Sequence, residues 1–306
     1  MSLPYTLRRL HLRHEVASYR EESCLDASLS TRHSVVVKMR LTVVRDEART
    51  GPRGSAVSVV RVGTWNVEYA RGAEKNDRRR AQLQSRRAAV WVLTETHDDL
   101  DLSATHDAVQ SERRYATPGG RWTTIWTSLP VLERLETTDP TRCVAVRLDG
   151  GAAGEFVVFG TVLPWNGDPG PESDNPAKGW TEFYRVTRVQ AADWRQLRRR
   201  YPNTALVVAG DLNHDLGGRH YYGTKAGREL LTSELASAGL VCLTATNAFA
   251  RGAMEHPPID HVCAGPGRGR TLSAEVEGWD CTVDGTRLSD HGGVLASLEL
   301  ASDPAR

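Results

Sequence analysis

The chain has 306 residues, 40% of them hydrophobic and 25% charged, with a formal net charge of +1. This composition is ordinary for a soluble globular protein, and the length allows a large core that needs no disulfide staples. The small total charge hides an asymmetry, because residues 1–58 carry a net charge of +4 and the remainder −3. A protein that follows long duplex DNA usually shows a basic footprint, so only local patches of the main domain are left for such contacts.

The cysteines and the apolar runs bear on the compartment. Five cysteines are scattered along the chain with no C-x-x-C pair: Cys24, Cys143, Cys242, Cys263 and Cys281. Their odd number and irregular spacing disfavour a zinc site of thiolates and fit free thiols in a reducing compartment, which predicts a cytoplasmic protein. No apolar run reaches the ~18 residues that a transmembrane helix needs, and the N-terminal residues lack the apolar core of a secretory signal.

The N-terminal residues 1–57 do not have the pattern of a domain. They begin with a polar, arginine-rich stretch of weak periodicity, and RDEARTGPRGS at 45–55 has the composition of a linker. Two interpretations remain open: a poorly ordered extension, or a start codon assigned too far upstream, with Met39 as the true start. The domain itself is expected to span residues 58–301.

Apolar runs and helical periods then give the expected elements in chain order. Buried strands are predicted at 58–68, 88–96, 121–132, 141–150, 154–165, 204–210, 257–265 and 292–300, and helices at 76–90, 179–201 and 225–240. The Pro-, Gly- and Asp-rich segment 166–179 is a candidate functional loop. Many strands, few helices and no regular βαβ alternation predict a mixed-sheet architecture with helices outside, not a Rossmann fold or a TIM barrel.

Polar side chains recur where these apolar runs end. They are Asn66, Glu68, Glu95, Asp211, Asn213, Asp260, Asp290 and His291. One such residue is easily explained by a turn or a helix cap, but a set of this size predicts that the strand ends converge on a cup of hard oxygen ligands. Mg²⁺ prefers a few carboxylates plus water and phosphate oxygens. An Asp–His pair can hold an imidazole protonated beside an oxyanion.

Five segments carry a resemblance to a known family: TWNVE, TET, GDLN, IDHV and LSDHGGV, in that order. They resemble the motifs of the endonuclease/exonuclease/phosphatase superfamily, the deoxyribonuclease-I-like metallophosphoesterases. The resemblance covers roughly residues 58–300; GDLN and SDHGGV are fairly specific, and the other three are weak alone. It implies an α/β (α+β) fold, a four-layered sandwich of two packed mixed β-sheets flanked by helices, in agreement with the strand-rich pattern.

The resemblance also implies a metal site. Asn66 and Glu95 would hold a divalent cation, Mg²⁺ or Mn²⁺, with Glu95 as the main ligand. Asp290 would complete the metal region. Glu68 stands where some members have an acidic neighbour of the metal, so it is a possible further ligand.

Four residues would carry the catalytic roles. Asp211 would activate or orient the attacking water, and Asn213 would hold that water or a phosphate oxygen. Period-two alternation of an extended chain would place these two side chains on the same side. His291 would donate a hydrogen bond to the phosphate and stabilise charge in the transition state, with Asp260 orienting its ring.

The sequence departs from the family pattern at one position. Many members carry a catalytic His or Tyr at the end of the strand where this chain has Val162, and valine cannot donate a hydrogen bond to a phosphate. Trp165 and Asn166 are therefore candidate substrate-binding residues, and Arg121 is another nearby candidate. The departure argues against deoxyribonuclease-type chemistry and leaves simple phosphoester hydrolysis open.

Other histidines and the basic helices have plainer interpretations. His256 and His261 are expected to be structural, and His214 and His220 to lie in a loop near the mouth of the site. The basic helix faces are expected to be solvated, with nucleic-acid contact as a minority interpretation.

The expected function is hydrolysis of a phosphodiester or phosphomonoester by a metal-dependent phosphoesterase. The substrate is either a nucleic acid or a small or lipid-linked phosphoester. The alternative is a catalytically degenerate binding module on the same fold, which fits Val162 but not the retention of the other site residues. The sequence leaves the oligomeric state open.

Overall fold

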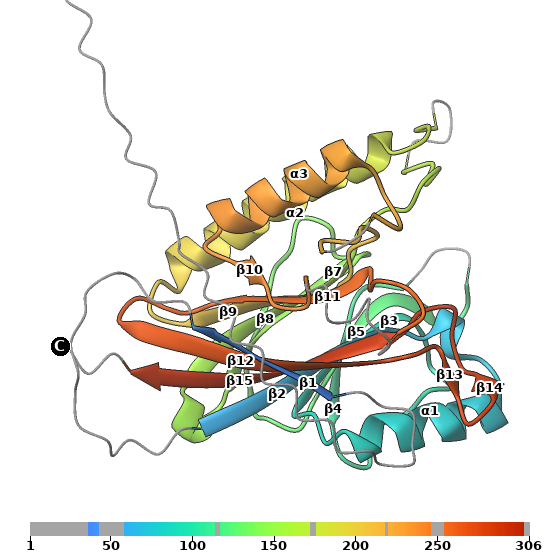
Figure 1. The fold of residues 1–306 in the computed structure, drawn as a ribbon, viewed down its shortest axis with the longest axis horizontal. Helices are drawn as coiled ribbons and strands as arrows, with labels where there is room; N and C mark the ends of the chain where they lie inside the picture. The colour runs from blue at the N-terminus through green and yellow to red at the C-terminus, as the bar shows by residue number, and fades with distance from the viewer. Residues whose placement is uncertain are drawn as a thin grey trace, which may run out of the picture.

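The computed structural model describes residues 36–42, 58–113, 117–171, 176–217, 220–245 and 254–302. Two mixed β-sheets pack face to face, and helices cover their outer sides, with α2 and α3 over one sheet and α1 beside the other (Figure 1). This confirms the predicted four-layered α/β sandwich. Within the described residues, no helix has the length and apolarity needed to cross a membrane.

The first sheet has seven strands. Their order is β1 (Val36–Thr42), β12 (Arg270–Trp279), β15 (Gly293–Ser302), β2 (Ser58–Asn66), β3 (Val90–His97), β5 (Gly120–Thr127) and β4 (Asp107–Gln110). All neighbours are antiparallel except β2 and β3, which are parallel and are joined through α1 (Ala73–Ser85). A parallel pair needs such a crossover, because a tight turn cannot return the chain to the same end.

The second sheet repeats this plan with six strands. Their order is β10 (Val241–Cys242), β11 (Asp260–Gly265), β9 (Ala205–Asp211), β8 (Glu155–Val162), β7 (Cys143–Asp149) and β6 (Val131–Leu135). The parallel pair here is β8 and β9, connected by α2 (Thr181–Arg200), and α3 (Lys225–Ser237) packs beside α2. Short elements complete the chain: η1 (Glu68–Ala70), η2 (Gly151–Ala153) and the hairpin β13 (Thr282–Val283) and β14 (Thr286–Arg287).

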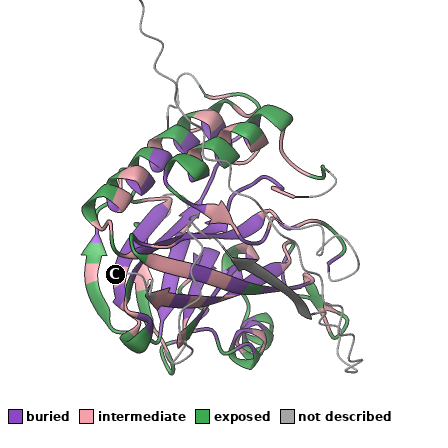
Figure 2. Cartoon of the chain, turned by 60° about the vertical axis from the view of Figure 1, so that its left-hand side comes forward, coloured by how far each residue is buried: buried purple, intermediate pink, exposed green. Residues whose placement is uncertain are grey.

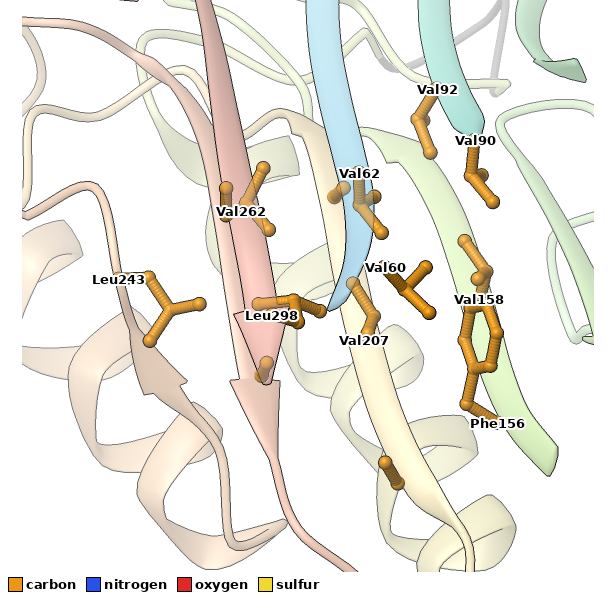
Figure 3. Packing of buried hydrophobic residues seen from close by; sticks show 14 of the residues in the cluster. Val60, Val62, Val90, Val92, Phe156, Val158, Val207, Leu243, Val262 and Leu298 are labelled. Atoms are coloured by element: carbon orange, nitrogen blue, oxygen red, sulfur yellow. The ribbon is translucent and has the colours of Figure 1, made fainter. Parts of the chain in front are cut away.

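The main core lies between the two sheets. Valines of β2, β3, β8, β9 and β11 project into it, and Figure 3 shows Val62, Val207 and Val262 among the side chains of this layer. A second apolar layer under α2 and α3 includes Phe183 and Trp194. The strands are therefore covered on both faces, which explains their nearly continuous apolar runs. The buried residues lie inside, and the helices expose only their outer sides (Figure 2).

Several differences from the sequence-based expectations concern strands; the short strands β4, β10, β13 and β14, for example, were not predicted. The predicted strand 121–132 is two strands in different sheets, β5 and β6, because the chain turns at Ser128–Pro130. Strand β12 was not predicted, although Leu272, Ala274 and Val276 alternate with less buried residues along it. Strand β1 lies within the segment expected to be poorly ordered and pairs with β12; the rest of 1–57 is outside the described residues.

Candidate active site

The site forms where the layer between the sheets changes from apolar to polar. On β9, the core residue Val207 is followed at period two by Ala209 and then Asp211, and on β11 Val262 is preceded by Asp260. Because side chains alternate along a strand, both carboxylates point into the layer between the sheets. Asp260 and Asp211 are direct partners in the β9–β11 register. Two buried carboxylates thus meet at the end of the core.

His291 lies beside these carboxylates. Its Nδ1 is 2.5 Å from Asp260 Oδ2, and its Nε2 is 4.0 Å from Asp211 Oδ2. Ligand-type atoms of the three residues all lie within 4.8 Å of one another, the one such grouping found among the described residues. A carboxylate only accepts hydrogen bonds, so Nδ1 of His291 carries a hydrogen and donates it to Asp260. We therefore interpret Asp211, Asp260 and His291 as an acid–base array.

Burial and the neighbouring charges shift the pKa values of Asp211 and His291. Burial raises the pKa of Asp211 to about 7, although the charge of His291 and the hydrogen bonds from Asn66 and Asn213 oppose the rise. Burial also opposes charge on His291, but the carboxylates of Asp260 and Asp211 outweigh burial and raise the pKa of His291 to about 10. At neutral pH His291 is therefore an imidazolium with a hydrogen on both nitrogens, of which Nδ1–H donates to Asp260. Asp211 sits near the midpoint of its titration, where a general base works well.

Asn66 connects this array to Glu95. Its amide nitrogen Nδ2 is 3.1 Å from Asp211 Oδ2 and 3.3 Å from Glu95 Oε1, while its Oδ1 accepts the backbone N–H of Glu68 at 3.0 Å. In this orientation the amide donates to both carboxylates. Its part as a direct metal ligand therefore stays a prediction, which rests on the remaining lone pair of Oδ1.

Three of the predicted site residues have left-handed backbone angles. Glu95 and Asn213 both have φ of 51°, and Glu68 has φ of 48°. Such a conformation costs a non-glycine residue on the order of 1–3 kcal/mol and is typical of functional sites. Glu95 is unpaired in the β3–β5 ladder, between the Thr94 and Thr96 pairs, although the register is the same on both sides of it.

The GDLN segment ends β9 in a tight turn. Strand β9 stops at Asp211, whose Oδ1 accepts the backbone N–H of Asn213 at 2.9 Å, and Asn213 Nδ2 donates to the carbonyl of Leu163 at 2.8 Å. The Asx-type bond and the left-handed φ replace the simple alternation expected for this pair. A Cβ at Gly210 would lie 1.8 Å from the carbonyl oxygen of Thr161, so only glycine fits there. Binding of water or phosphate by Asn213 stays a prediction.

Two further predicted metal residues lie at the rim. Asp290 is exposed, and its charge contributes to the raised pKa of His291. Glu68 follows Asn66 and lies 3.5 Å from Arg287. Neither belongs to the compact grouping of Asp211, Asp260 and His291. Their part in metal binding stays a prediction.

Supporting residues of the site were missed from the sequence. Buried Ser289 donates from Oγ to the backbone carbonyl of Asn66 at 2.6 Å and accepts the N–H of His291 at 3.1 Å. Trp65 Nε1 donates to the carbonyl of His291 at 2.8 Å. Buried Arg79 of α1, in a helix expected to have only a solvated basic face, donates to the carbonyl of Leu288 at 2.9 Å. These bonds tie the loop before β15 to the end of β2, and only the position of Ser289 within the LSDHGGV motif could have pointed to it.

Aromatic residues lie near the predicted substrate-binding residues. Val162 is buried and pairs with Asp211 in the β8–β9 register, so no side chain at this position donates to a phosphate. Trp165 is half-buried, with its ring 5.5 Å from that of Trp122, and Asn166 is exposed. Tyr222 was not predicted; burial raises the pKa of its hydroxyl, and the nearby charge of Asp211 adds to the rise.

Two expectations for the neighbouring histidines are corrected. His214 is fully buried and stacks on Phe183 at 4.0 Å, so it is a core residue and not part of an open loop at the mouth. Burial lowers the pKa of His214 to about 4. His256, expected to be structural, is exposed and stacks on Tyr221 at 4.3 Å, whereas His261 is buried as expected.

Comparison with known proteins identifies the family of the chain. Residues 63–291 match the model of the Endonuclease/Exonuclease/phosphatase family. The chain belongs to this family. Its members are metal-dependent phosphoesterases, and the matched range contains Asn66, Glu95, Asp211, Asp260 and His291. No match was found among curated proteins.

Solved structures with similar folds include several members of the family. The human Nocturnin catalytic domain with bound sulfate has a TM-score of 0.56 and 14% identity, over 80% of this chain and 94% of that one. An endonuclease/exonuclease/phosphatase from Beutenbergia cavernae has a TM-score of 0.54 and 20% identity, over 81% of this chain and 73% of that one. D. rerio TDP2 complexed with single strand DNA product has a TM-score of 0.53 and 14% identity, over 79% of this chain and 99% of that one. At identities this low, the similarity shows a shared fold alone.

Proposed function

We propose that this protein is a Mg²⁺- or Mn²⁺-dependent phosphoesterase that hydrolyses a phosphodiester or phosphomonoester by attack of water. One observation carries the proposal: an imidazolium, His291, is held by Asp260 at 2.5 Å and faces the buried carboxylate of Asp211 at 4.0 Å. A positive donor beside a carboxylate of raised pKa provides both the charge stabilisation and the base that water attack on a phosphate needs. Membership of the family supports the same reaction class.

The roles of the chain's own residues follow from their hydrogen bonds. Asp211 accepts the proton of the attacking water, because its pKa of about 7 lies near neutral pH. Asp260 fixes the ring of His291 through Nδ1, which leaves Nε2–H to donate to a phosphate oxygen. Asn66 donates to Asp211 and so keeps its carboxylate aligned. Placement and electrostatic stabilisation are the main needs of phosphoryl transfer.

The residues present fit a hard divalent cation. Glu95, Asn66 and Asp290 offer the oxygen donors that Mg²⁺ prefers, with Glu68 as a further carboxylate. Burial raises the pKa of Asp211 despite the charge of His291, so a cation beside this carboxylate would favour its ionised form. A bound cation supplies Lewis-acid polarisation of the phosphoryl oxygen. Asn66 holds the Glu95 carboxylate in place for it, through the 3.3 Å contact.

Two substrate classes are consistent with the proposal: nucleic acid, and a small or lipid-linked phosphoester. The Trp122–Trp165 pair and exposed Asn166 form the rim at which we expect the substrate to bind. TDP2 in complex with a single-stranded DNA product supports the first class. Buried Val162 and the net charge of −3 beyond residue 58 argue against a duplex-DNA enzyme. We assign the activity to residues 58–301 and, from the free cysteines, a cytoplasmic location.

The test measures phosphate and nucleotide release from a panel of substrates with Mg²⁺, with Mn²⁺ and with EDTA. The panel holds single-stranded DNA, duplex DNA, RNA, inositol phosphates and a generic phosphodiester. We expect metal-dependent turnover that is strongly reduced in His291→Gln and kept in His106→Gln, since His106 bonds to the carbonyl of Ala88 near the other end of β3. Turnover that survives both EDTA and His291→Gln would exclude the proposed mechanism.

The alternative is a degenerate binding module, which the absence of a donor at Val162 favours. Thermal unfolding with and without Mg²⁺ separates the two when it is combined with the panel, because a bound cation stabilises the folded state. Metal-dependent stabilisation with no turnover on any substrate would favour the binding module. Stabilisation together with turnover favours the enzyme.

A further inference from the structure

A pair of cysteines faces each other at the edge of the second sheet. Cys242 of the edge strand β10 is the direct partner of Cys263 of β11, and both thiols are free. The next pair along, Leu243 and Val262, is joined by a backbone hydrogen bond of 2.9 Å. The cysteines therefore occupy a non-hydrogen-bonded position of the antiparallel ladder, where facing side chains approach most closely. This spacing suits a disulfide.

The two cysteines differ in exposure. Both belong to the apolar layer beneath α2 and α3, but Cys263 is fully buried and Cys242 is half-buried. A small oxidant therefore reaches Cys242 first. Among the described cysteines, Cys242 is the one that faces buried Cys263 across the ladder.

A hydroxyl and an imidazole complete the group. Thr244 and His261 are opposite each other one period-two step along the same face, with Thr244 Oγ1 2.9 Å from His261 Nδ1 and 3.7 Å from Cys242 Sγ. His261 Nε2 donates to the carbonyl of His214 at 2.9 Å, so Nδ1 faces the Thr244 hydroxyl and can take up the proton that the Cys242 thiol loses. The Thr244 hydroxyl thus connects the thiol of Cys242 to a base.

The acidity of the thiols agrees with this geometry. Burial raises the pKa of Cys242, but the hydrogen bond from Cys263 and the charge of His261 outweigh burial and bring it well below the usual value. Burial and the neighbouring Cys242 raise the pKa of Cys263 well above the usual value. One thiol of the pair is therefore an anion more readily than the other, as an attacking and a resolving cysteine require.

We propose that Cys242 and Cys263 form a redox-active dithiol that hydrogen peroxide converts to a disulfide across β10 and β11. The Cys242 thiolate attacks one peroxide oxygen, the O–O bond breaks, and the leaving hydroxide takes the thiol's proton to form water. Cys242 is then a sulfenic acid. The sulfur of Cys263 attacks it, the S–O bond breaks, and the released hydroxide leaves as water with the proton of Cys263. Two thiols are oxidised and one peroxide is reduced to two waters.

The pair is separate from the phosphate site. Asp260 precedes Cys263 by three residues on β11 and projects from the opposite face, into the layer between the sheets. The disulfide is read by mass, so its test does not depend on the proposed phosphoesterase activity.

The full chain is treated with hydrogen peroxide, blocked with N-ethylmaleimide and mapped by peptide mass spectrometry with and without dithiothreitol. We expect loss of two of the five thiols and a Cys242–Cys263 peptide pair that dithiothreitol separates. Cys281→Ser, which removes a half-buried thiol outside the pair, should form the same pair.

Two results would overturn the proposal in the wild-type map alone, whether or not the variants fold. One is Cys242 and Cys263 both alkylated after peroxide treatment. The other is Cys242 found as a sulfinic acid or linked to a different cysteine. Cys263→Ser should leave Cys242 as a sulfenic acid that a dimedone probe labels, and Cys242→Ser should leave Cys263 unlabelled.

Discussion

The middle of the sandwich and its polar end are built from the same strands, yet they differ in what makes them stable. In the middle, Val62 and Val207 are fully buried and gain about 25 cal/mol for each Å² of apolar surface removed from water. At the end of the same strands, Asn66 and Asp211 are almost as deeply buried. A buried polar group costs free energy unless it is paired. The polar end is thus held in place by the apolar middle, at some cost to stability.

The comparison shows where rigidity comes from. Strands β9 and β11 are fixed by their apolar residues, and their register then places Asp211 opposite Asp260. Preorganised charges are effective because they do not have to reorganise during the reaction. We expect function and stability to respond in opposite ways in the two regions.

The largest expected effect is that of Asp211→Asn. Loss of the base should lower kcat by roughly 10²–10⁴-fold. The same change should stabilise the metal-free protein: the pKa of Asp211 is about 7 in the folded state against 3.8 ordinarily, so the folded state loses stability as pH rises from 3.8 to 7. Thermal unfolding at pH 8 should show a higher Tm than wild type, and the gain should vanish near pH 4.

A matched control for this variant is Asp149→Asn, at the other end of the second sheet, where Asp149 accepts the N–H of Gly151 and asparagine can do the same. It should change neither kcat nor Tm. A lower Tm for Asp211→Asn at pH 8 would contradict the view that the polar end reduces stability.

The opposite pattern is expected for Phe156→Ala in the middle of the sandwich. Phe156 is fully buried and pairs with Ala205 at the start of β9, the far end from Asp211. Its loss should lower the free energy of unfolding by about 3–5 kcal/mol in urea titrations. The kcat per folded molecule should stay unchanged. A large fall in kcat without loss of stability would show that the two regions are not separable in this way.

The pH dependence of kcat/KM tests the protonation states assigned to Asp211 and His291 at the polar end. Activity should rise as Asp211 loses its proton, with a limb near pH 7, and fall as His291 loses its proton near pH 10. A bound divalent cation favours the charged carboxylate and should move the acidic limb to lower pH. In His291→Gln the basic limb should disappear; a limb that persists near pH 10 in this variant would belong to another group.

The smallest effect is expected for Ser289→Ala. This change removes a buried hydroxyl that links the carbonyl of Asn66 to the N–H of His291. It should destabilise the protein by about 1–3 kcal/mol, because buried partners lose their hydrogen bonds. Ser297→Ala, in the half-buried middle of β15, is the control and should be nearly neutral. An equal loss in both variants would deny Ser289 a special role.

Much of the site could be predicted from the sequence because strand ends and motifs mark it. Asp211, Asp260 and His291 each follow or precede an apolar run, and the structure brings them together. Apolar runs establish strands, and parallel crossovers place strand ends at one edge. The layered fold followed from the same runs together with the motifs.

Other features could not be predicted because they depend on tertiary contacts. The left-handed φ of Asn213 comes from the Asx-type bond to Asp211 and the contact with Leu163, which no period shows. His214 is polar in sequence, yet it is buried because Phe183 of α2 stacks on it. Strand β12 contains Glu275 and Glu277 and therefore lacks a continuous apolar run, although its period-two signal was present.

The pairing of β15 with β2 has a consequence for synthesis. Val294 of β15 is the ladder partner of Thr64 of β2, so β2 cannot pair on this edge until the ribosome has added 230 more residues. While the nascent chain grows, β2 presents an open edge that invites pairing with other chains. Contacts this distant in sequence also slow folding. The domain is therefore expected to complete its first sheet only after translation has passed β15, which makes it a client for chaperones and makes ribosome-bound fragments prone to aggregation.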